Sequence, residues 1–325
     1  MILPGRQWGA ALVAILIGMS AAHAQDVQQD VDYPTKKINF VVAFAAGGFA
    51  DTLARYVAQK LTEKLGQPVI LENRPGAGGN LAARAVRSAE PDGYTVLVTT
   101  TALAINATMY RQLDLSLDQL STVAIPAASP ETIAAHPSRP FSNLKEFLAW
   151  AENREITFGS AGVGSGSHLA AEYFFKVHAK VKALHVPFRG GAPAVQAVLG
   201  NQIDLVASSF GVNAQVSEGL LKGLAVASPA RNPAMPQVPT YKEAGFPLVA
   251  ESWVGFFVPA KTNPAIVATL NAAIGEVVSD SANRDHLSTL GFQVTVRPVA
   301  ESRAYLKAEV AKWGEMVRTV NIYVD

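Results

Sequence analysis

Short apolar runs alternate with segments of helical periodicity along most of the chain. Residues 38–44 are an apolar run, broken only by Asn39, that predicts a buried strand, and residues 52–65 carry apolar side chains on one helical face up to Gly66, where the helix should end. The same reasoning predicts further strands at 68–71, 95–100, 123–128, 132–135, 156–158, 183–188, 205–208, 223–228 and 252–258. Further helices are predicted at 80–89, 143–152 with Ser142 as its N-cap, 167–178, 192–199, 264–279, 282–290 and 300–317. This alternation indicates an α/β protein with parallel strand pairing and right-handed crossovers.

The length of the chain, 325 residues, is enough for two α/β domains that each have a core. A crossing to a second module near residue 125 and a return near residue 250, after the proline-rich residues 229–247, would make the first domain discontinuous. We therefore expect one domain from residues 33–124 plus 251–325 and another from residues 125–250.

The first 24 residues have the three parts of a secretory signal peptide. Arg6 supplies a positive charge, residues 9–19 are a short apolar run, and Ala22-His23-Ala24 is a small-residue cleavage site. The apolar run is about half as long as a membrane-spanning helix requires. We therefore expect cleavage after Ala24, export to the periplasm and no membrane anchor. The absence of cysteine excludes a lipid-anchored cysteine, thiol catalysis and cysteine metal sites.

Composition and motifs narrow the range of functions. Hydrophobic residues make up 49% of the chain and charged residues 16%, as in a globular protein, and the formal net charge of +1 indicates no nucleic acid partner. The sequence has no G-x-G-x-x-G after its first strand, no G-x-x-x-x-G-K-[ST], no G-x-S-x-G and no H-E-x-x-H. We therefore expect a protein that is not an enzyme and that holds neither a cofactor nor a metal.

Three glycine-rich loops follow predicted strands: residues 45–51, 160–168 and 188–191. Glycine lets backbone N–H groups approach a ligand closely, and a helix N-terminus adds unpaired N–H groups and partial positive charge. In α/β sheets, ligands bind outside the carboxyl ends of the strands, where these loops would lie. The loops therefore predict an anion site, although each is also consistent with a simple turn. Two residues of these loops also have structural interpretations that involve no ligand. Asp51 can be explained as a residue that only balances the dipole of the helix that follows, and His168 is more often a packed histidine than a base.

One run of nine residues is especially specific: Glu72-Asn73-Arg74-Pro75-Gly76-Ala77-Gly78-Gly79-Asn80. It occurs in a fixed order with residues 33–37, 44–51, Pro91-Asp92-Gly93-Tyr94, 159–169, 185–193, 225–240, Glu243-Ala244-Gly245 and Ala311-Lys312-Trp313-Gly314. Together these segments, which extend over about residues 33–322, resemble the extracytoplasmic solute receptors of tripartite tricarboxylate transporters, also called the Bug family.

The resemblance implies a type II periplasmic-binding-protein fold, in which two α/β domains are joined by a hinge and the ligand cleft lies between them. It implies a small carboxylate held largely by backbone amides and water between residues 45–51 and 160–168. It also implies a two-component integral membrane permease as the partner.

Five residues depart from the family pattern and bear on the ligand. Ala46 occupies the place of a usual proline, Phe49 that of a serine or threonine, and Phe188 that of a tyrosine. Ser208 and Ser209 stand where an acidic or amide residue is common. These changes favour a ligand with an aromatic or apolar body. The alternative is that Phe49 and Phe210 simply pack against the sheet.

The expected contacts combine backbone amides of the first two loops with hydroxyl groups, including that of Ser167. Arg189 is a candidate partner for the second acidic group of a dicarboxylate. The candidate ligand-binding residues are Ala46, Gly47, Gly48, Phe49, Asp51, Thr101, Ser160, Gly162, Gly164, Ser165, His168, Phe188, Arg189, Gly190 and Ser208.

Two other functions remain open from the sequence. An exported serine hydrolase acting on a small ester would use Ser209 or Ser165 with His168, but the sequence offers no nucleophile elbow and no clear third member of a triad. A periplasmic sensor would close around the same kind of ligand and dock a signalling receptor instead of a permease. The expected oligomeric state is a monomer.

Overall fold

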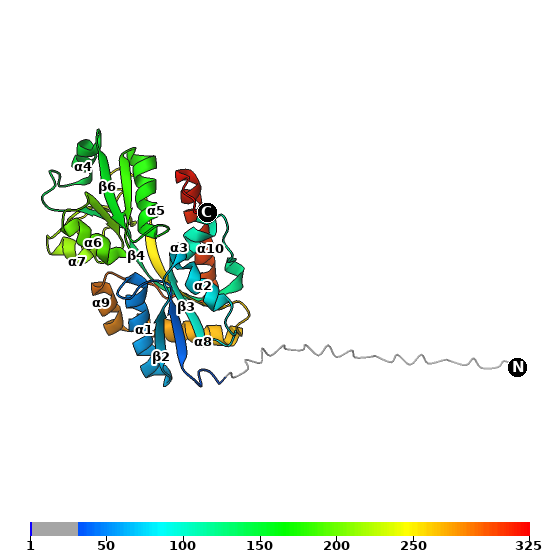
Figure 1. The fold of residues 1–325 in the computed structure, drawn as a ribbon. Helices are drawn as coiled ribbons and strands as arrows, with labels where there is room; N and C mark the ends of the chain where they lie inside the picture. Colours follow the sequence, from blue (N-terminus) through cyan, green and yellow to red (C-terminus); the bar gives the residue numbers. More distant parts are fainter. Residues whose placement is uncertain (2–31) are drawn as a thin grey trace. The chain divides into compact units, whose positions relative to one another are not determined.

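The computed structural model describes Met1 and residues 32–325 (Figure 1). The predicted signal peptide beyond Met1, with its cleavage site after Ala24, lies outside the described residues. None of the helices in residues 32–325 combines the length and the hydropathy that crossing a bilayer requires.

Six strands form the first sheet, in the order β11-β4-β10-β3-β1-β2. Their bounds are β1 Ile38–Val42, β2 Val69–Asn73, β3 Thr95–Thr100, β4 Leu120–Pro130, β10 Glu251–Pro259 and β11 Gln293–Val294. β1 pairs in parallel with β2 and β3, whereas β10 runs antiparallel to β3 and β4, and β11 antiparallel to β4. β1 and β3 lie inside the sheet and are buried on both faces along most of their length, which explains the consecutive apolar residues 40–42 of β1 and 96–98 of β3.

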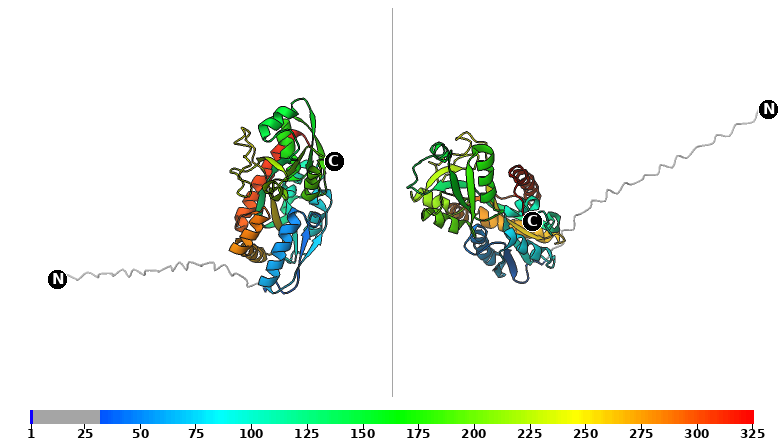
Figure 2. Two further views of the ribbon diagram at one scale, coloured as in Figure 1. Left: turned by 90° about the vertical axis from the view of Figure 1, so that its left-hand side faces the viewer. Right: turned by 45° about the horizontal axis from the view of Figure 1, so that its top comes forward.

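Five strands form the second sheet, in the order β7-β6-β8-β5-β9. Their bounds are β5 Thr132–Ala135, β6 Glu155–Ser160, β7 Lys182–Pro187, β8 Leu205–Ser208 and β9 Lys222–Val226. β6 is parallel to β7 and β8, whereas β5 is antiparallel to β8 and β9. In Figures 1 and 2 the green segments of this sheet gather at one end of the described residues, and the blue and orange segments at the other.

Helices cover both faces of both sheets. Their bounds are α1 Phe49–Leu65, α2 Asn80–Arg87, α3 Ala102–Met109, α4 Leu144–Ala151, α5 Gly166–Tyr173, α6 Gly191–Leu199, α7 Val212–Ser217, α8 Pro264–Ser279, α9 Ser281–Thr289 and α10 Val299–Val320. Short 3-10 helices span Ala77–Gly79 and Leu117–Gln119, and α5 continues as a π-helix over Phe174–Ala179. The buried side chains place α1, α8 and α9 on one face of the first sheet and α2, α3 and α10 on the other. They place α4 and α5 on one face of the second sheet and α6 and α7 on the other.

One hydrophobic cluster continues from the first sheet into the second. It includes Trp253 of β10, Trp313 of α10 and Phe158 of β6. The indole N–H groups of Trp253 and Trp313 both donate to Glu309 Oε2, at 3.0 and 2.8 Å, and this shared acceptor fixes α10 against β10. The two sheets therefore share a core on the side of α3, α5 and α10.

The chain passes between the sheets at one residue and returns through a longer segment. Glu131 alone separates β4 of the first sheet from β5 of the second. The return from β9 to β10 includes Ala227 and Ala250. Backbone hydrogen bonds from Glu131 N to Ala250 O (2.9 Å) and from Ala227 N to Glu131 O (2.7 Å) hold the two passages together.

The structure departs from the sequence prediction where periodicity is weak. The helices α3 and α7 were not predicted, because α3 is buried on almost every side and α7 is too short to show a period. α1 begins at Phe49 rather than at Thr52. The predicted parallel pairing holds within β1–β3 and β6–β8 but is wrong for β4, β5 and β10, which run antiparallel to their neighbours.

The predicted N-cap of α4 is wrong by one residue. Asn143, in an extended conformation, accepts a hydrogen bond from Glu146 N through its side chain at 2.9 Å. Ser142 instead donates its backbone N–H to Glu146 Oε2, at 2.7 Å. The glutamate therefore reaches back past the capping residue, and Asn143 takes the role that was assigned to Ser142.

This difference predicts unequal effects of two neighbouring substitutions. Asn143→Ala should lower the free energy of unfolding by about 1 kcal/mol, because the amide of Glu146 loses its acceptor. Ser142→Ala should change it by less than about 0.5 kcal/mol, because only the backbone of Ser142 is used. Urea unfolding of residues 25–325 measures both values, and equal losses would contradict the capping assignment.

Candidate functional site

Two predicted segments lie at one edge of the first sheet. β1 and β3 are parallel, so residues 43–48 after β1 and Thr101 after β3 leave the sheet at the same edge. Residues 43–48 lead into α1, whose N-cap, Gly48, is extended and provides no capping side chain. The first N–H groups of α1 therefore have no side-chain acceptor, and the neighbouring Ala46 and Gly47 are exposed.

Asp51 fixes the conformation of this loop. Its carboxylate, 1% exposed, accepts hydrogen bonds from Gly47 N (2.8 Å), Arg55 Nε (2.8 Å) and Asn73 Nδ2 (2.7 Å). Asn73 also donates to Phe44 O, at 3.0 Å. Burial alone raises the pKa of Asp51, but the hydrogen bonds from Arg55, Gly47 and Asn73 outweigh burial and hold the pKa below its usual range. Both oxygens accept from groups of the protein, so Asp51 orients Gly47.

Two of the predicted loops, residues 160–168 and 188–191, leave the second sheet at the same edge as the segment after β8. β6, β7 and β8 run in parallel and end at Ser160, Pro187 and Ser208. Phe188 N donates to Ser160 O at 3.1 Å, which ties the second of these loops to the first. Gly162 has a φ of +117°, and a Cβ there would lie 2.9 Å from Phe188 O. Glycine is therefore required for this close approach of the two loops.

The serine hydroxyls of residues 160–168 bond to the loop itself and to His185 of β7. Ser160 Oγ lies 2.7 Å from His185 Nε2 and accepts from Gly162 N at 3.1 Å. Ser165 Oγ donates to Gly162 O at 2.7 Å and caps α5 by accepting from His168 N at 3.2 Å. These hydroxyls therefore shape the loop around its glycines.

His168 is a packed aromatic residue. Its side chain is buried, and its ring stacks on His185 with 4.0 Å between the ring centroids. Burial, with smaller effects from His185 and Lys176, lowers the pKa of His168 to about 3. Burial lowers the pKa of His185 to about 4. Both rings are therefore neutral near pH 7. The Ser165 hydroxyl bonds to Gly162 O, Ser167 Oγ and the backbone N–H of His168, and not to the His168 ring.

Three phenylalanines join the two sheets on the side of α1 and α9. Phe49, the first residue of α1, stacks on Phe292, with centroids 4.9 Å apart and an interplanar angle of 14°. Phe210, which follows β8 of the second sheet, lies 5.7 Å from both rings. Phe49 and Phe210 therefore pack on each other and on Phe292.

Two candidate hydroxyls are used inside the fold. Thr101 is fully buried and its Oγ1 accepts from Trp253 N at 2.8 Å, which links the end of β3 to β10. Ser208 Oγ donates to Phe210 O at 2.8 Å. Each of them holds a loop at the edge of its sheet.

The third loop presents one cation. The ring of Phe188 packs over Gly159, where a Cβ would lie 3.0 Å from it. Arg189 is exposed and forms no hydrogen bond or ion pair that the structure records with another described residue. Gly190, at a φ of +124°, turns the chain into α6. Arg189 is therefore available to an anionic group.

Sequence reasoning missed two buried amides next to these loops. Asn106 Nδ2, on α3, donates to Gly78 O (2.9 Å) and to Asn80 Oδ1 (3.0 Å). A Cβ on Gly164 of the second sheet would lie 3.1 Å from Asn106 Oδ1. Asn80 is the last residue of the nine-residue run that carries the family resemblance, and this position could have identified it. Asn106 lies in an apolar segment in which the sequence contains no comparable motif.

Comparisons with known proteins identify the family of this chain. A family profile described as tripartite tricarboxylate transporter family receptor matches residues 53–322. The chain belongs to this family. Its similarity to BugT of Bordetella pertussis is 30% identity over 315 residues, which covers 95% of this chain and 96% of that protein.

Solved structures of the family superpose on this receptor. The periplasmic binding protein BugD matches with a TM-score of 0.82 and 30% identity, over 90% of this chain and 99% of its own. An R. palustris protein solved with adipate matches with a TM-score of 0.85 and 27% identity, over 90% of this chain and 99% of its own. MatC from Rhodopseudomonas palustris, with bound malate, matches with a TM-score of 0.81 and 32% identity, over 88% of this chain and 100% of its own.

The family confirms several expectations. The fold is that of the periplasmic binding proteins of this family, with two sheets, and the protein is a solute-binding receptor and not an enzyme. The hydrolase alternative based on Ser209 or Ser165 with His168 is therefore wrong. In residues 32–325 there is no group of three or more His, Cys, Asp or Glu side chains that could hold a metal ion.

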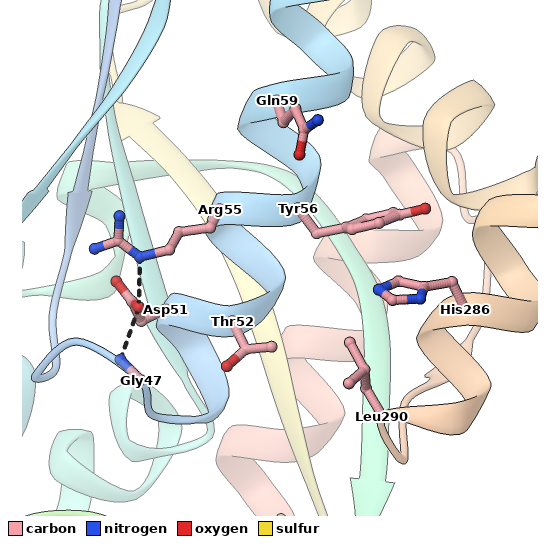
Figure 3. Close-up of a pocket in the computed structure, with 8 residues that line it drawn as sticks. All are labelled: Gly47, Asp51, Thr52, Arg55, Tyr56, Gln59, His286 and Leu290. Carbon is pink, nitrogen blue, oxygen red and sulfur yellow. Dashed lines mark hydrogen bonds and ion pairs between the residues drawn. The ribbon is translucent and has the colours of Figure 1, made fainter.

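The receptor has a pocket of about 370 Å³ between α1 and α9 (Figure 3). It is lined by Gly47, Asp51, Thr52, Arg55, Tyr56, Gln59, His286 and Leu290. Arg55 at this pocket is held by Asp51, and Tyr56 stacks on His286 with centroids 4.9 Å apart. Only Gly47 and Asp51 belong to the predicted set. We therefore place the candidate site at the glycine loops and not in this pocket.

The role of Asp51 in this receptor predicts a loss of stability. Asp51→Asn should lower the free energy of unfolding at pH 7 by about 2 kcal/mol, because hydrogen bonds to a charged carboxylate are lost or weakened. The folded pKa of Asp51 is depressed, so its contribution is present above the unfolded pKa of about 4 and is lost as pH falls through the folded pKa. The variant should therefore lose less stability on acidification than the natural chain.

Asp92→Asn is the matched control for this measurement. Asp92 forms an exposed ion pair with Lys36 (2.9 Å), and such pairs contribute less than about 1 kcal/mol. Urea unfolding at pH 7 and at low pH compares the two variants. Equal losses from Asp51→Asn and Asp92→Asn would contradict the role of Asp51 in fixing the loop.

Proposed function

We propose that this receptor binds a small carboxylate in the periplasm and delivers it to a two-component integral membrane permease. The observation that carries this proposal is a pair of helix N-termini behind glycine loops, one from each sheet. α1 has no capping side chain, and the Ser165 side chain caps α5 through one amide, that of His168. N-termini with unpaired N–H groups and a positive dipole end are suited to a carboxylate.

Known ligands of relatives support this chemistry. The R. palustris relative was solved with adipate, and MatC with malate, and both molecules carry two carboxylates. In this chain the amides of Gly48 and Phe49 would face one side of a carboxylate, and the unpaired amides at the start of α5 the other. The expected amides of Gly47, Gly162 and Gly164 donate instead to Asp51, Ser160 and His168.

The aromatic residues favour an aliphatic dicarboxylate over an aromatic ligand. The ring of Phe49 is stacked on Phe292 and that of Phe188 is packed over Gly159, so these rings are engaged by protein. Arg189 is exposed and would pair with the second carboxylate in a two-pronged geometry.

Ligand capture would occur by movement of two domains, residues 33–124 plus 251–325 and residues 125–250, about a hinge. The sheet topology supports this division. The strands of each sheet fall within one of these groups except at residues 125–130, where β4 of the first sheet continues past the expected boundary as far as Glu131. The shared core near α5 and α10 would act as the pivot, and the contact of Phe210 with Phe49 and Phe292 would open and close.

Export follows from the predicted signal peptide, residues 1–24, and agrees with the periplasmic relative BugD. The receptor would act as a monomer. A sensor that docks a signalling receptor needs the same closed form, so binding of the loaded receptor to each membrane partner separates sensing from transport.

A ligand screen tests the proposal directly. Adipate and malate should raise the melting temperature of residues 25–325 in a concentration-dependent manner, because a ligand that binds only the folded state stabilises it by about 2.7 kcal/mol at 100 times its Kd. Acetate, benzoate and a diethyl ester of adipate serve as comparisons. No shift with any carboxylate would contradict the proposal.

The proposed role of Arg189 predicts that the receptor distinguishes dicarboxylates from monocarboxylates. Arg189→Ala should weaken binding of a dicarboxylate by about tenfold or more and leave binding of a monocarboxylate nearly unchanged, because only the second carboxylate loses its partner. Arg318→Ala, which removes an exposed arginine of α10, is the control. Isothermal titration measures the affinity of the natural chain and of both variants for each ligand class, and an equal loss for both classes in Arg189→Ala would exclude this role.

A further inference from the structure

Glu131 is a buried carboxyl group at the passage between the two sheets. It is 3% exposed and separates β4 from β5. Its backbone is held by hydrogen bonds to Ala250 O and from Ala227 N. A carboxyl group in such a place is unusual, because a buried charge is costly unless it is paired.

The side chain of Glu131 is only half satisfied. Ser252 Oγ, from β10, donates to Oε1. Oε2 has no hydrogen-bond partner among the described residues, although its solvent exposure is negligible. The structure records no basic side chain among the groups that influence this carboxyl. Burial therefore dominates, and it raises the pKa of Glu131 to about 8 even though the hydrogen bond from Ser252 opposes this.

The carboxyl group of Glu131 lies directly against the first residue of α5. A Cβ on Gly166 would lie 2.8 Å from Glu131 Oε1, so the helix can begin here only because residue 166 is glycine. Gly166 immediately follows the glycine loop, residues 160–165, that would face the ligand. The N-terminus of α5 is thus positioned between a buried carboxyl group of the protein and the expected carboxylate of the ligand.

Other titratable groups near Glu131 do not neutralise a charge on it. Tyr241, buried in the return segment, has a pKa raised by burial and by the charge of Glu131. On β10, Glu251 follows Ala250 and alternates in direction with Ser252. The charged groups that influence Glu251 are Lys312, Glu309 and Arg297. On α5, His168 is neutral near pH 7.

Two carboxylates at one helix end would compete. The N-terminus of a helix carries about half of one positive charge, which one anion can balance. A second anion in the same poorly solvated region would be repelled by the first, since Coulomb interactions are strong where water is excluded. Loss of the proton from Glu131 would therefore weaken binding of an anionic ligand, and binding of the ligand would retain or take up that proton.

We propose that Glu131 is a positioning residue of the ligand site, which must carry a proton for the N-terminus of α5 to hold a carboxylate. Carboxylate binding is then coupled to proton binding at the passage between the sheets. This inference rests on the proposed function, because it assumes a carboxylate at residues 160–166.

The affinity for adipate as a function of pH tests this coupling. Between pH 6.5 and 9.5 the natural chain should bind adipate more weakly as pH rises, by up to about tenfold per pH unit above the midpoint. Glu131→Gln, which stays neutral, should bind with the affinity that the natural chain has at pH 6.5 and should show no such decrease. Glu251→Gln, a neutral change at a nearby glutamate of β10, should keep the pH dependence of the natural chain.

A second variant and a second measurement support the test. Ser252→Ala removes the hydrogen bond that favours the ionised form, so the midpoint of the decrease should move to higher pH. Titration calorimetry in buffers of different ionisation enthalpy should show uptake of protons on binding near pH 8.5 in the natural chain and none in Glu131→Gln.

The outcomes separate this inference from the proposed function. Adipate binding with the same pH dependence in the natural chain and in Glu131→Gln would overturn the inference and leave the function intact. Loss of binding at all pH values in a folded Glu131→Gln would also overturn it, because a neutral residue would then not be sufficient. If no carboxylate binds to the natural chain at any pH, the proposed function fails and the inference fails with it.

Discussion

The unpaired backbone N–H groups at the start of α1 are the constraint on which the rest of the site depends. Helix N-termini leave four such groups, and most helices satisfy some of them with a capping side chain. In α1 the capping position is Gly48, which has no side chain, and the acidic residue of the first turn, Asp51, accepts from Gly47 N instead. Asp51 therefore holds the loop through the amide of Gly47, while the amides of Gly48 and Phe49 have no partner among the described residues, which suits a binding site for an anion.

The second sheet also has a fixed glycine loop before a helix N-terminus, but other side chains fix it. There the hydroxyls of Ser160 and Ser165 bond to the loop backbone, and Gly162 lets the loop approach Phe188. The two loops come from different sheets that are connected at Glu131 and share a core near α10. A ligand between them would connect the sheets on the side away from that core. Binding, closure and the protonation state of Glu131 are therefore linked in this account.

Much of the fold could be predicted because its central strands are apolar runs and its helices have an apolar face. β3 and β8 have the predicted bounds, and Gly66 ends α1 in a left-handed conformation as expected. Helix α3 could not be predicted, because burial on almost every side removes the periodicity. The direction of β4 and β10 could not be predicted either, because strand pairing depends on contacts between residues far apart in the sequence.

The site was predictable only at the level of its loops. Glycines and helix starts identify where amides are free, but the sequence does not show which side chains hold them. Asn73 and His185 act through distant contacts, with Asp51 and Ser160, that only the folded chain brings together. Glu131 gave no signal, because a single glutamate near a strand resembles any surface residue until its burial is known.

Hydrogen exchange measured by mass spectrometry tests the central claim most directly, namely that one carboxylate contacts free amides of both sheets. Peptides that cover residues 44–52 and residues 160–168 should both exchange more slowly when adipate, or the carboxylate with the largest melting-temperature shift, is bound. Protection of only one of these segments, or protection confined to residues 52–59 and 283–290 beside the pocket between α1 and α9, would contradict the account.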